Sequence, residues 1–441
     1  METWGSNKIY GKLGTERPLV TDPTAPAIRP GKLDLKDYSG PLQPRLSVLD
    51  LSKELLIKMV MRLGPIDWGL IDGQWGNRVT EMWGSRVACA LDDKLWDNMA
   101  KCLYIYSSET LNYQGTAVEK ALKCYQSNVV AGFMTDCEVE LLTPNLGILT
   151  INRCNTLDYF EKRGEFLRLI DVCWKVDPPC FEAIGTCFDP DMKCVSLKLP
   201  PQKSKDDVAC AWGFYLGEIK TGDIHGYVER RNKAAQEEGV PTDLNDYSGP
   251  LHRRIGPENF SKEALAKILT QESRMYQIEN GQWHSLVKEA YGDEAAWERQ
   301  ERVWEDHVPF NARFFSKTLN VQGSPVEKAI KCLQLNPAFG LINDLECKLE
   351  NPNLGVVTCY RCATRDYFER LGGEVNMSRI CGDMEQRIWQ KWAQYFHPNI
   401  EVKPVKLPPK DERHGSQVMA QFVPKRAEGE IVCQWEFKLK E

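Results

Sequence analysis

The sequence predicts an α+β fold made of two tandem homologous modules, each an antiparallel sheet with flanking helices, arranged as an intramolecular pseudo-dimer. Three observations lead to this prediction. Apolar residues at helical spacing precede short apolar runs joined by turn residues, which is the order helices first, then strands. That order occurs twice along the 441 residues. The composition, 42% hydrophobic and 27% charged, is that of an ordinary globular protein of roughly two or three domains.

Short motifs that return in the same order carry the duplication. DYSGPL occurs at 37–42 and 246–251, and DGQW at 72–75 matches NGQW at 280–283 after a slip of one residue. From there an offset of 208 holds without a gap for over a hundred residues. Later matched motifs are TLNYQG and TLNVQG, VEKALKC and VEKAIKC, TPNLGILTINRC and NPNLGVVTCYRC, DYFEKRG and DYFERLG, two copies of KLPP, and CAWGF and CQWEF. Such self-similarity indicates modules of about 180–190 residues.

The elements follow from periodicity and turn signals. The predicted helices of the first module cover 51–63, 68–96, 118–124 and 157–188, the last interrupted at Asp177-Pro178-Pro179, where Asp can cap a helix. The predicted strands cover 137–142, 147–153, 194–199 and 208–216, the first two forming a hairpin. The chain therefore divides into an extended arm (1–30), a first module (31–218), a charged linker (219–242) and a second module (243–441).

Charge and hydropathy exclude several functions. The formal net charge of −6 gives no electrostatic reason to expect nucleic acid or an anionic membrane surface as a partner. The first residues lack the pattern of a signal peptide, and no apolar run is long enough to span a bilayer. We therefore expect a soluble, cytoplasmic protein. Sequence motifs for nucleotide binding (GxGxxG, GxxxxGK[ST]), zincins (HExxH) and α/β-hydrolases (GxSxG) are absent.

Sixteen cysteines are many for a chain expected in a reducing compartment, where thiols are core residues, metal ligands or nucleophiles. Eight form matched pairs: Cys124/Cys332, Cys154/Cys362, Cys173/Cys381 and Cys210/Cys433. Cys124 lies on an amphipathic helix and is most simply a core residue. The other three thiols per module could converge at one edge of the sheet, for packing, for a zinc or iron site, or as a reactive cysteine in a pocket. The candidate metal ligands are Cys154, Cys173, Cys210, Cys362, Cys381 and Cys433, without an identified fourth ligand.

Other cysteine patterns are weaker. Cys359 and Cys362 form a CxxC that has no twin in the first module. Cys180 is predicted in the first turn of a helix capped by Asp177, where the helix dipole lowers a thiol pKa, but its counterpart is Ile388.

Matched aromatic and polar residues form a second group of candidates. They are either core residues or the lining of a ligand pocket, and the retained glycine of the DGQW and NGQW motifs suggests close backbone approach or a ligand-facing surface. The candidate substrate-binding residues are Asp72, Trp75, Trp96, Trp212, Asn280, Trp283, Trp304 and Trp435. Arg153 and Arg361 could pair a substrate carboxylate, although a salt bridge to a nearby acid such as Asp158 or Asp366 is the simpler reading.

The motifs DYSGPL, DGQW, Arg-Cys at the end of a hairpin, a Cys about 19 residues later, KLPP and C-x-W-x-F resemble a widespread prokaryotic family of unknown function, common in anaerobes. That family is related to the L-2-amino-thiazoline-4-carboxylic acid hydrolases and, more distantly, to 4-vinyl-reductase-type small-molecule-binding domains. The resemblance covers both modules and implies an α+β module that holds a small cyclic or aromatic ligand. In the vinyl-reductase-like domains a cysteine-rich zinc site can brace the sheet, but the KLPP segment here lacks the cysteine that such a site uses.

Two functional hypotheses follow. The first is an enzyme that hydrolyses a small cyclic or aromatic substrate, with a cysteine nucleophile and an arginine that orients a carboxylate. Its candidate catalytic residues are Cys154, Cys173, Arg153, Cys362, Cys381 and Arg361. The second is a non-catalytic small-molecule-binding pseudo-dimer whose cysteines are structural. A third possibility is that one module carries the function and the other is a scaffold. The match of Asp72 with Asn280 in the duplication would permit this. Further homo-oligomerisation is left open.

Overall fold

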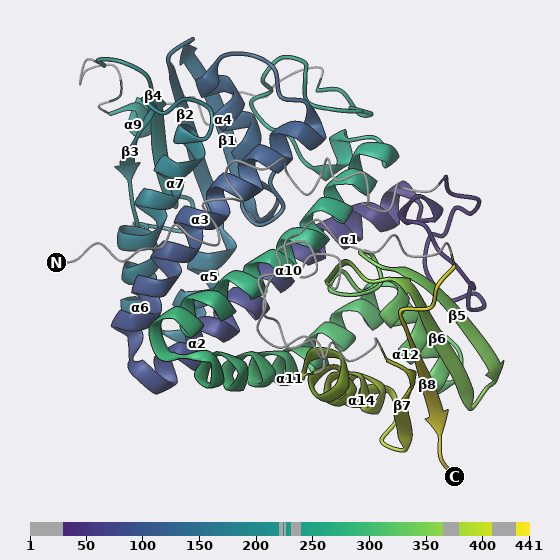
Figure 1. Ribbon diagram of the computed structural model, residues 1–441. Helices are drawn as coiled ribbons and strands as arrows, with labels where there is room; N and C mark the ends of the chain where they lie inside the picture. Colours follow the sequence, from purple (N-terminus) through teal and green to yellow (C-terminus); the bar gives the residue numbers. More distant parts are fainter. Residues whose placement is uncertain (1–29, 220–223, 225, 231–239, 365–378, 408–428) are drawn as a thin grey trace, which may run out of the picture.

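The computed structural model describes residues 30–219, 224, 226–230, 240–364, 379–407 and 429–441. It is an α+β fold in which two four-stranded antiparallel sheets lie on either side of a central group of helices (Figure 1). This confirms the predicted class. The predicted arm, apart from its last residue, and most of the predicted linker lie outside the described residues.

The two sheets have the same strand order. In the first half of the chain (31–218) it is β1-β2-β4-β3, and in the second half (243–441) it is β5-β6-β8-β7. The strands are β1 (Thr135–Thr143), β2 (Leu146–Cys154), β3 (Lys193–Lys198), β4 (Cys210–Tyr215), β5 (Asp344–Asn351), β6 (Leu354–Arg361), β7 (Ile400–Lys406) and β8 (Cys433–Leu439). All four strands predicted for the first half are therefore present, with boundaries shifted by one or two residues.

Helices fill the space between and around the sheets. Those of the first half are α1 (Lys53–Ile66), the π-helix η3 (Asp67–Asp72), α2 (Gly73–Trp83), α3 (Ser85–Leu111), α4 (Ala117–Gln126), α5 (Asn155–Arg163), α6 (Phe166–Asp171), the π-helix η5 (Val172–Val176) and α7 (Asp177–Thr186). Those described in the second half are α10 (Lys262–Tyr291), α11 (Asp293–Thr318), α12 (Pro325–Gln334), the π-helix η7 (Arg379–Met384) and α14 (Glu385–Phe396). Short helix α9 (Tyr227–Arg230) lies in the linker, and 3-10 turns η2 (Val48–Asp50), η4 (Gly132–Met134) and η6 (Pro257–Asn259) complete the list.

The stretch 68–96 is helical, as predicted, except at Gly84, where one helix ends and the next begins. Gly84 separates α2 from α3 with a positive φ of 88°, a conformation that other residues adopt only with strain.

The long helices of both halves pack together at the centre of the molecule. Helix α10 contacts α1, α3 and α11, and α11 also contacts α2 (Figure 1). Their shared core contains the largest buried side chains of the bundle, including Trp75, Tyr276 and Trp283. Because each long helix of one half packs on helices of the other, the two sheets are joined through one apolar core.

The one-residue slip between the repeats has a structural location. The segment α1–η3–α2 has one residue more than its counterpart α10, which is α-helical throughout. The first half contains instead the π-helical turn η3, which ends at Asp72. A π-turn is how a helix accommodates one inserted residue without losing its register on either side.

The two DYSGPL segments are exchanged between the halves. Tyr38 donates its backbone N–H to Leu319 at 2.6 Å and its hydroxyl to Gln334 at 2.7 Å, both in the second half. Tyr247 makes the same two contacts in the first half, to Leu111 at 2.6 Å and to Gln126 at 2.8 Å. The residues that follow each segment also bind an edge strand of the other half. The Cys347 N–H of β5 donates to the Pro44 carbonyl at 2.8 Å, and the Val139 N–H of β1 donates to the Arg253 carbonyl at 2.9 Å. DYSGPL is thus a structural connection between the halves.

Cleavage of the linker tests this connection. If a protease site is inserted at 231–239 and cut, we expect the two fragments to elute together by size exclusion, because the exchanged segments and the central helices hold them. The same elution is repeated in urea below the unfolding midpoint, which separates fragments that are only weakly associated. Separation of the fragments in buffer alone would contradict the expectation.

Matched caps and glycines position the helices that cover the sheets. Thr116 and Ser324 accept from the backbone N–H groups of Glu119 and Glu327 at 3.2 Å and cap α4 and α12. At Gly147 in β2, an added Cβ would lie 2.5 Å from Leu122 of α4, so the helix approaches the sheet more closely than a larger residue allows. The Cys124 and Cys332 side chains are fully buried in these contacts, as predicted for core residues. Among the described residues no helix combines the length and apolar character needed to cross a membrane.

Candidate functional site

In the first half, the matched cysteines meet at one end of the sheet. Strand β2 ends at Cys154, and β4 begins at Cys210, which lies opposite Ile151. Cys173 lies in the π-helical turn η5, and its electrostatic neighbours are Asp177, Cys154 and Cys210. These three thiols and the carboxyl form one group, which we call the first thiol cluster.

Burial sets the protonation of the first thiol cluster. It raises the pKa of Asp177 to about 7 and raises the pKa values of the Cys154, Cys173 and Cys210 thiols. The thiols are therefore protonated at neutral pH, while the carboxyl is poised between its two forms. The Cys173 thiol is within hydrogen-bonding reach of the Asp177 carboxyl, which keeps some accessible surface. A carboxyl with this pKa beside a thiol can accept and return the thiol's proton.

The second half has a corresponding group. Cys381 lies in π-turn η7, as Cys173 lies in η5, and Glu385 follows it by four residues, as Asp177 follows Cys173. Burial raises the pKa of Glu385 to about 7. Cys433 and Cys359 lie opposite each other in β8 and β6, and contact with Cys433 together with burial raises the pKa of Cys359. The electrostatic neighbours of Cys359 also include Cys362 and Glu385. We call this group the second thiol cluster.

The structure gives the metal hypothesis no support. In the part of the chain that is described, which includes all six candidate ligands, no three His, Cys, Asp or Glu side chains are arranged to hold a metal ion. No disulfide links any described cysteine.

The interpretation of Cys180 as an activated thiol is wrong. Asp177 is helical (φ −60°, ψ −44°) and continues η5 into α7, so it is not an N-cap. Burial, followed by the charge of Asp177, raises the Cys180 pKa instead of lowering it.

Two of the candidate tryptophans belong to the sheets. Trp212 stacks on Phe181 with centroids 4.1 Å apart, Phe181 stacks on Tyr125 at 5.3 Å, and the Trp212 indole N–H donates to the Cys210 sulfur at 3.3 Å. This aromatic column borders the first thiol cluster. Trp435 is the counterpart of Trp212 and is equally buried, with no hydrogen-bond partner for its indole nitrogen.

The DGQW and NGQW motifs contact each other. The Trp75 indole donates to Asn280 at 3.0 Å, the Trp283 indole donates to Asp72 at 2.9 Å, and the two rings lie parallel with centroids 6.2 Å apart. A Cβ at Gly281 would meet no atom within 4 Å, so close backbone approach does not explain the glycine there. These residues form a reciprocal contact between the halves.

The remaining candidates are two tryptophans and two arginines. Trp304 packs against Tyr276 and His307 between α10 and α11, whereas Trp96 hydrogen-bonds to Asp92 within the first half. Arg153 is mostly exposed and pairs with Asp158 at 3.1 Å, which agrees with the simpler reading. Arg361 ends β6, directly before Cys362.

Sequence reasoning missed the carboxyls. Asp177 and Glu385 follow matched cysteines at the same spacing, so a search for acids conserved between the two halves would have found them. Asp177 was considered only as a helix cap, because the two prolines after it suggested the start of a helix.

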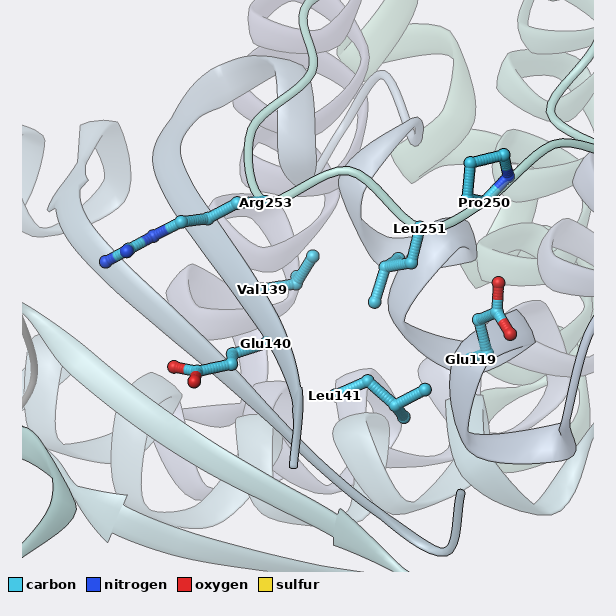
Figure 2. Close-up of a pocket in the computed structure, with 7 residues that line it drawn as sticks. All are labelled: Glu119, Val139, Glu140, Leu141, Pro250, Leu251 and Arg253. Atoms are coloured by element: carbon cyan, nitrogen blue, oxygen red, sulfur yellow. The ribbon is translucent and has the colours of Figure 1, made fainter. Parts of the chain in front are cut away.

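A surface hollow lies elsewhere, between β1 and the exchanged segment of the second half. It has a volume of about 440 Å³ and an apolar floor of Val139, Leu141 and Leu251, and charged groups surround it (Figure 2). The other lining residues are Glu119, Glu140, Pro250 and Arg253. None of the predicted site residues lines this hollow.

The fold and the two thiol clusters define an α+β protein with a thiol–carboxyl pair in the first half and a cysteine and a carboxyl at the same spacing in the second. In comparisons with known proteins, the chain matches no family model, no curated protein and no solved structure. The resemblance described above therefore stays a prediction.

Proposed function

We propose that this protein is an enzyme that hydrolyses a small cyclic or aromatic molecule with a cysteine nucleophile, and that its two halves form an intramolecular pseudo-dimer. The observation that carries the proposal is the thiol–carboxyl pair at the same spacing in both halves, Cys173 with Asp177 and Cys381 with Glu385. The reciprocal contacts of Trp75 with Asn280 and Trp283 with Asp72 support the pseudo-dimer.

The pair suits covalent hydrolysis because a protonated thiol needs a base. In the proposed reaction the Cys173 sulfur bonds to an electrophilic ring carbon, and its proton passes to Asp177. The bond from that carbon to the ring nitrogen, oxygen or sulfur then breaks, and the departing atom takes the proton from Asp177. Water cleaves the carbon–sulfur bond and returns a hydrogen to the thiol. The aromatic column of Tyr125, Phe181 and Trp212 supports a preference for a flat ring.

The alternative is a binding module whose thiols are structural, and two observations favour it. Burial raises the pKa of each thiol of the first cluster, which disfavours a resting thiolate, and four of the candidate ligand-binding residues are used in contacts between the halves. Both functions place a small molecule near the clusters. A reducing cytoplasm is the compartment we propose for either, since no described cysteine is in a disulfide.

Substitution of the pair separates the two functions. With a panel of thiazolines, lactams and cyclic imides, we expect turnover that Cys173→Ala removes and that Asp177→Asn lowers by about 10²–10⁴-fold, the usual contribution of a general base. The products are measured by mass spectrometry, and thermal unfolding checks that both variants fold.

Cys194→Val is the matched control, because the second half has Val402 at this position. It should retain turnover. Turnover that persists in Cys173→Ala would contradict a nucleophilic role for this residue, and binding without turnover by the wild-type protein would favour the alternative function.

A further inference from the structure

A row of three carboxyls, of which Asp72 is buried and Asp92 and Asp177 are partly buried, leads from the first thiol cluster to the contact between the halves. Asp177 begins α7, Asp92 lies on α3, and Asp72 ends η3. Helix α3, which carries Asp92, contacts α2, which directly follows Asp72, and also contacts η5 and α7, the second of which begins at Asp177. Asp72 and Asp177 are the two largest charge influences on Asp92, and Asp72 itself accepts the Trp283 indole N–H at 2.9 Å.

The row holds protons at neutral pH. Burial raises the pKa of Asp72 to about 7, as it does for Asp177, and burial with both neighbouring carboxyls raises the pKa of Asp92 well above its usual range. The charges of Asp72 and Asp177 both oppose ionisation of Asp92, so Asp92 does not titrate independently of the other two carboxyls. One Asp92 oxygen, Oδ1, is inaccessible to solvent and has no hydrogen-bond partner.

The other groups around the row change this balance little. Arg168 favours the charged form of Asp72, and the Trp96 side chain hydrogen-bonds to Asp92. Asp93 disfavours the charged form of Asp92. The thiols that interact with the row are Cys89, Cys154, Cys173, Cys180 and Cys210.

At two of the three matched positions, the second half has an amide in place of the carboxyl. The counterparts of Asp72 and Asp92 are Asn280 and Gln300, and only the third carboxyl is retained, as Glu385. Asn280 accepts the Trp75 indole N–H at 3.0 Å, and Gln300 donates to the Met384 sulfur at 3.8 Å. An amide has nearly the shape of a carboxyl but is neither protonated nor deprotonated near neutral pH. The two halves therefore differ in the number of carboxyls that can bind a proton, while they retain similar packing.

We infer that Asp72, Asp92 and Asp177 form a proton-holding row that serves Cys173, and that the first half is the half that carries out proton transfer. Asp177 exchanges a proton with the thiol, as in the proposed function on which this inference rests. Asp92 and Asp72 are positioning residues that share this proton and keep Asp177 available for the next transfer. The second half, with amides at two of the three positions, retains its fold and lacks the row.

The row is tested first without a substrate. In the infrared spectrum at pH 6–7 we expect the C=O band of a protonated, buried carboxylic acid, and we expect Asp92→Gln to weaken it. Gln300→Asp, the reverse exchange in the second half, is the matched variant and should add such a band. Both substitutions exchange residues that the chain already accepts at matched positions, so the variants should fold.

A second measurement is the change of protein stability with pH, for which the row predicts the direction. A carboxyl whose pKa is about 7 in the folded state and about 3.9 in the unfolded state stabilises the fold at low pH. That stabilisation is lost as the pH rises from about 4 through 7. Asp72→Asn and Asp92→Gln should therefore make the melting temperature depend less on pH over this range. The row would be overturned if the melting temperature of both variants depended on pH as it does in the wild-type protein and if the infrared band of the protonated acid were also unchanged.

Turnover provides the last measurement. On a substrate found with the panel above, Asp92→Gln should lower kcat at least about tenfold and flatten its pH profile, with KM unchanged. Trapped covalent adduct should map to Cys173 and not to Cys381. Equal trapping at Cys381 would overturn the assignment to the first half. An acid band in a protein that forms no adduct would support the row and contradict only the hydrolytic function.

Discussion

Trp283→Ala is expected to destabilise the protein by about 3–5 kcal/mol, the usual loss for a fully buried tryptophan. The side chain has no accessible surface and stacks parallel to Trp75 across the contact between the halves. Its indole N–H also supplies a hydrogen bond to the buried Asp72 carboxyl. The substitution thus opens a cavity and leaves a buried acceptor without its donor, and both effects weaken the contact that joins the two halves.

Urea unfolding followed by tryptophan fluorescence and circular dichroism measures this loss. Trp283→Phe retains most of the ring and removes the N–H, so it should cost less and isolates the hydrogen bond. Trp83→Ala is the control at the same contact: its ring stacks on Tyr291 at 3.9 Å, but both residues keep solvent exposure. We expect Trp83→Ala to lower the free energy of unfolding by about 0.5–1.5 kcal/mol. A similar small loss for Trp283→Ala would contradict its central role.

Lys123→Met is expected to cost about 3–5 kcal/mol, because removal of one partner from a buried ion pair leaves the other uncompensated. The Lys123 ammonium is fully buried and pairs with Glu119 at 2.8 Å. It also donates to the carbonyls of Gln114 at 2.7 Å and of Gly249 at 2.6 Å. Gly249 belongs to the exchanged segment of the second half, so the lysine holds that segment on the first half.

Lys331 provides the internal replicate. It is equally buried, pairs with Glu327 at 2.8 Å and donates to Gly40 in the other exchanged segment. Lys331→Met should therefore cost about as much as Lys123→Met. Lys120→Met on the same helix as Lys123 is the control, since this lysine is half-buried and should tolerate the change. Adding Glu119→Gln to Lys123→Met should recover part of the loss, and no recovery would contradict the ion-pair explanation.

The sequence was most informative where local patterns decide the structure. Turn residues and alternating apolar runs located all four strands of the first half, and matched motifs located the same order of strands in the second. It was less informative at the long helices, because a π-turn such as η3 and a break such as Gly84 do not change the overall apolar periodicity.

The candidate site was predicted in part. Matched thiols indicated the group of Cys154, Cys173 and Cys210, since three retained cysteines in different elements can meet at the end of a sheet. The partner carboxyl was missed. The DGQW motif was interpreted as either core or a ligand-facing surface, and its residues contact the motif of the other half. Conservation between repeats has two causes, a shared site and a shared contact, and the sequence alone does not distinguish them.

By itself, the sequence determined that there are two similar halves, which strands each contains and which residues both halves retain. These properties depend on local periodicity and on comparison of the chain with itself. Only the tertiary structure decided that the DYSGPL segments are exchanged, that Trp75 and Trp283 meet, and that Asp72, Asp92 and Asp177 form a row. The physical reason is that contacts across more than a hundred residues depend on how helices pack, and burial in that packing changes the chemistry of an ordinary aspartate.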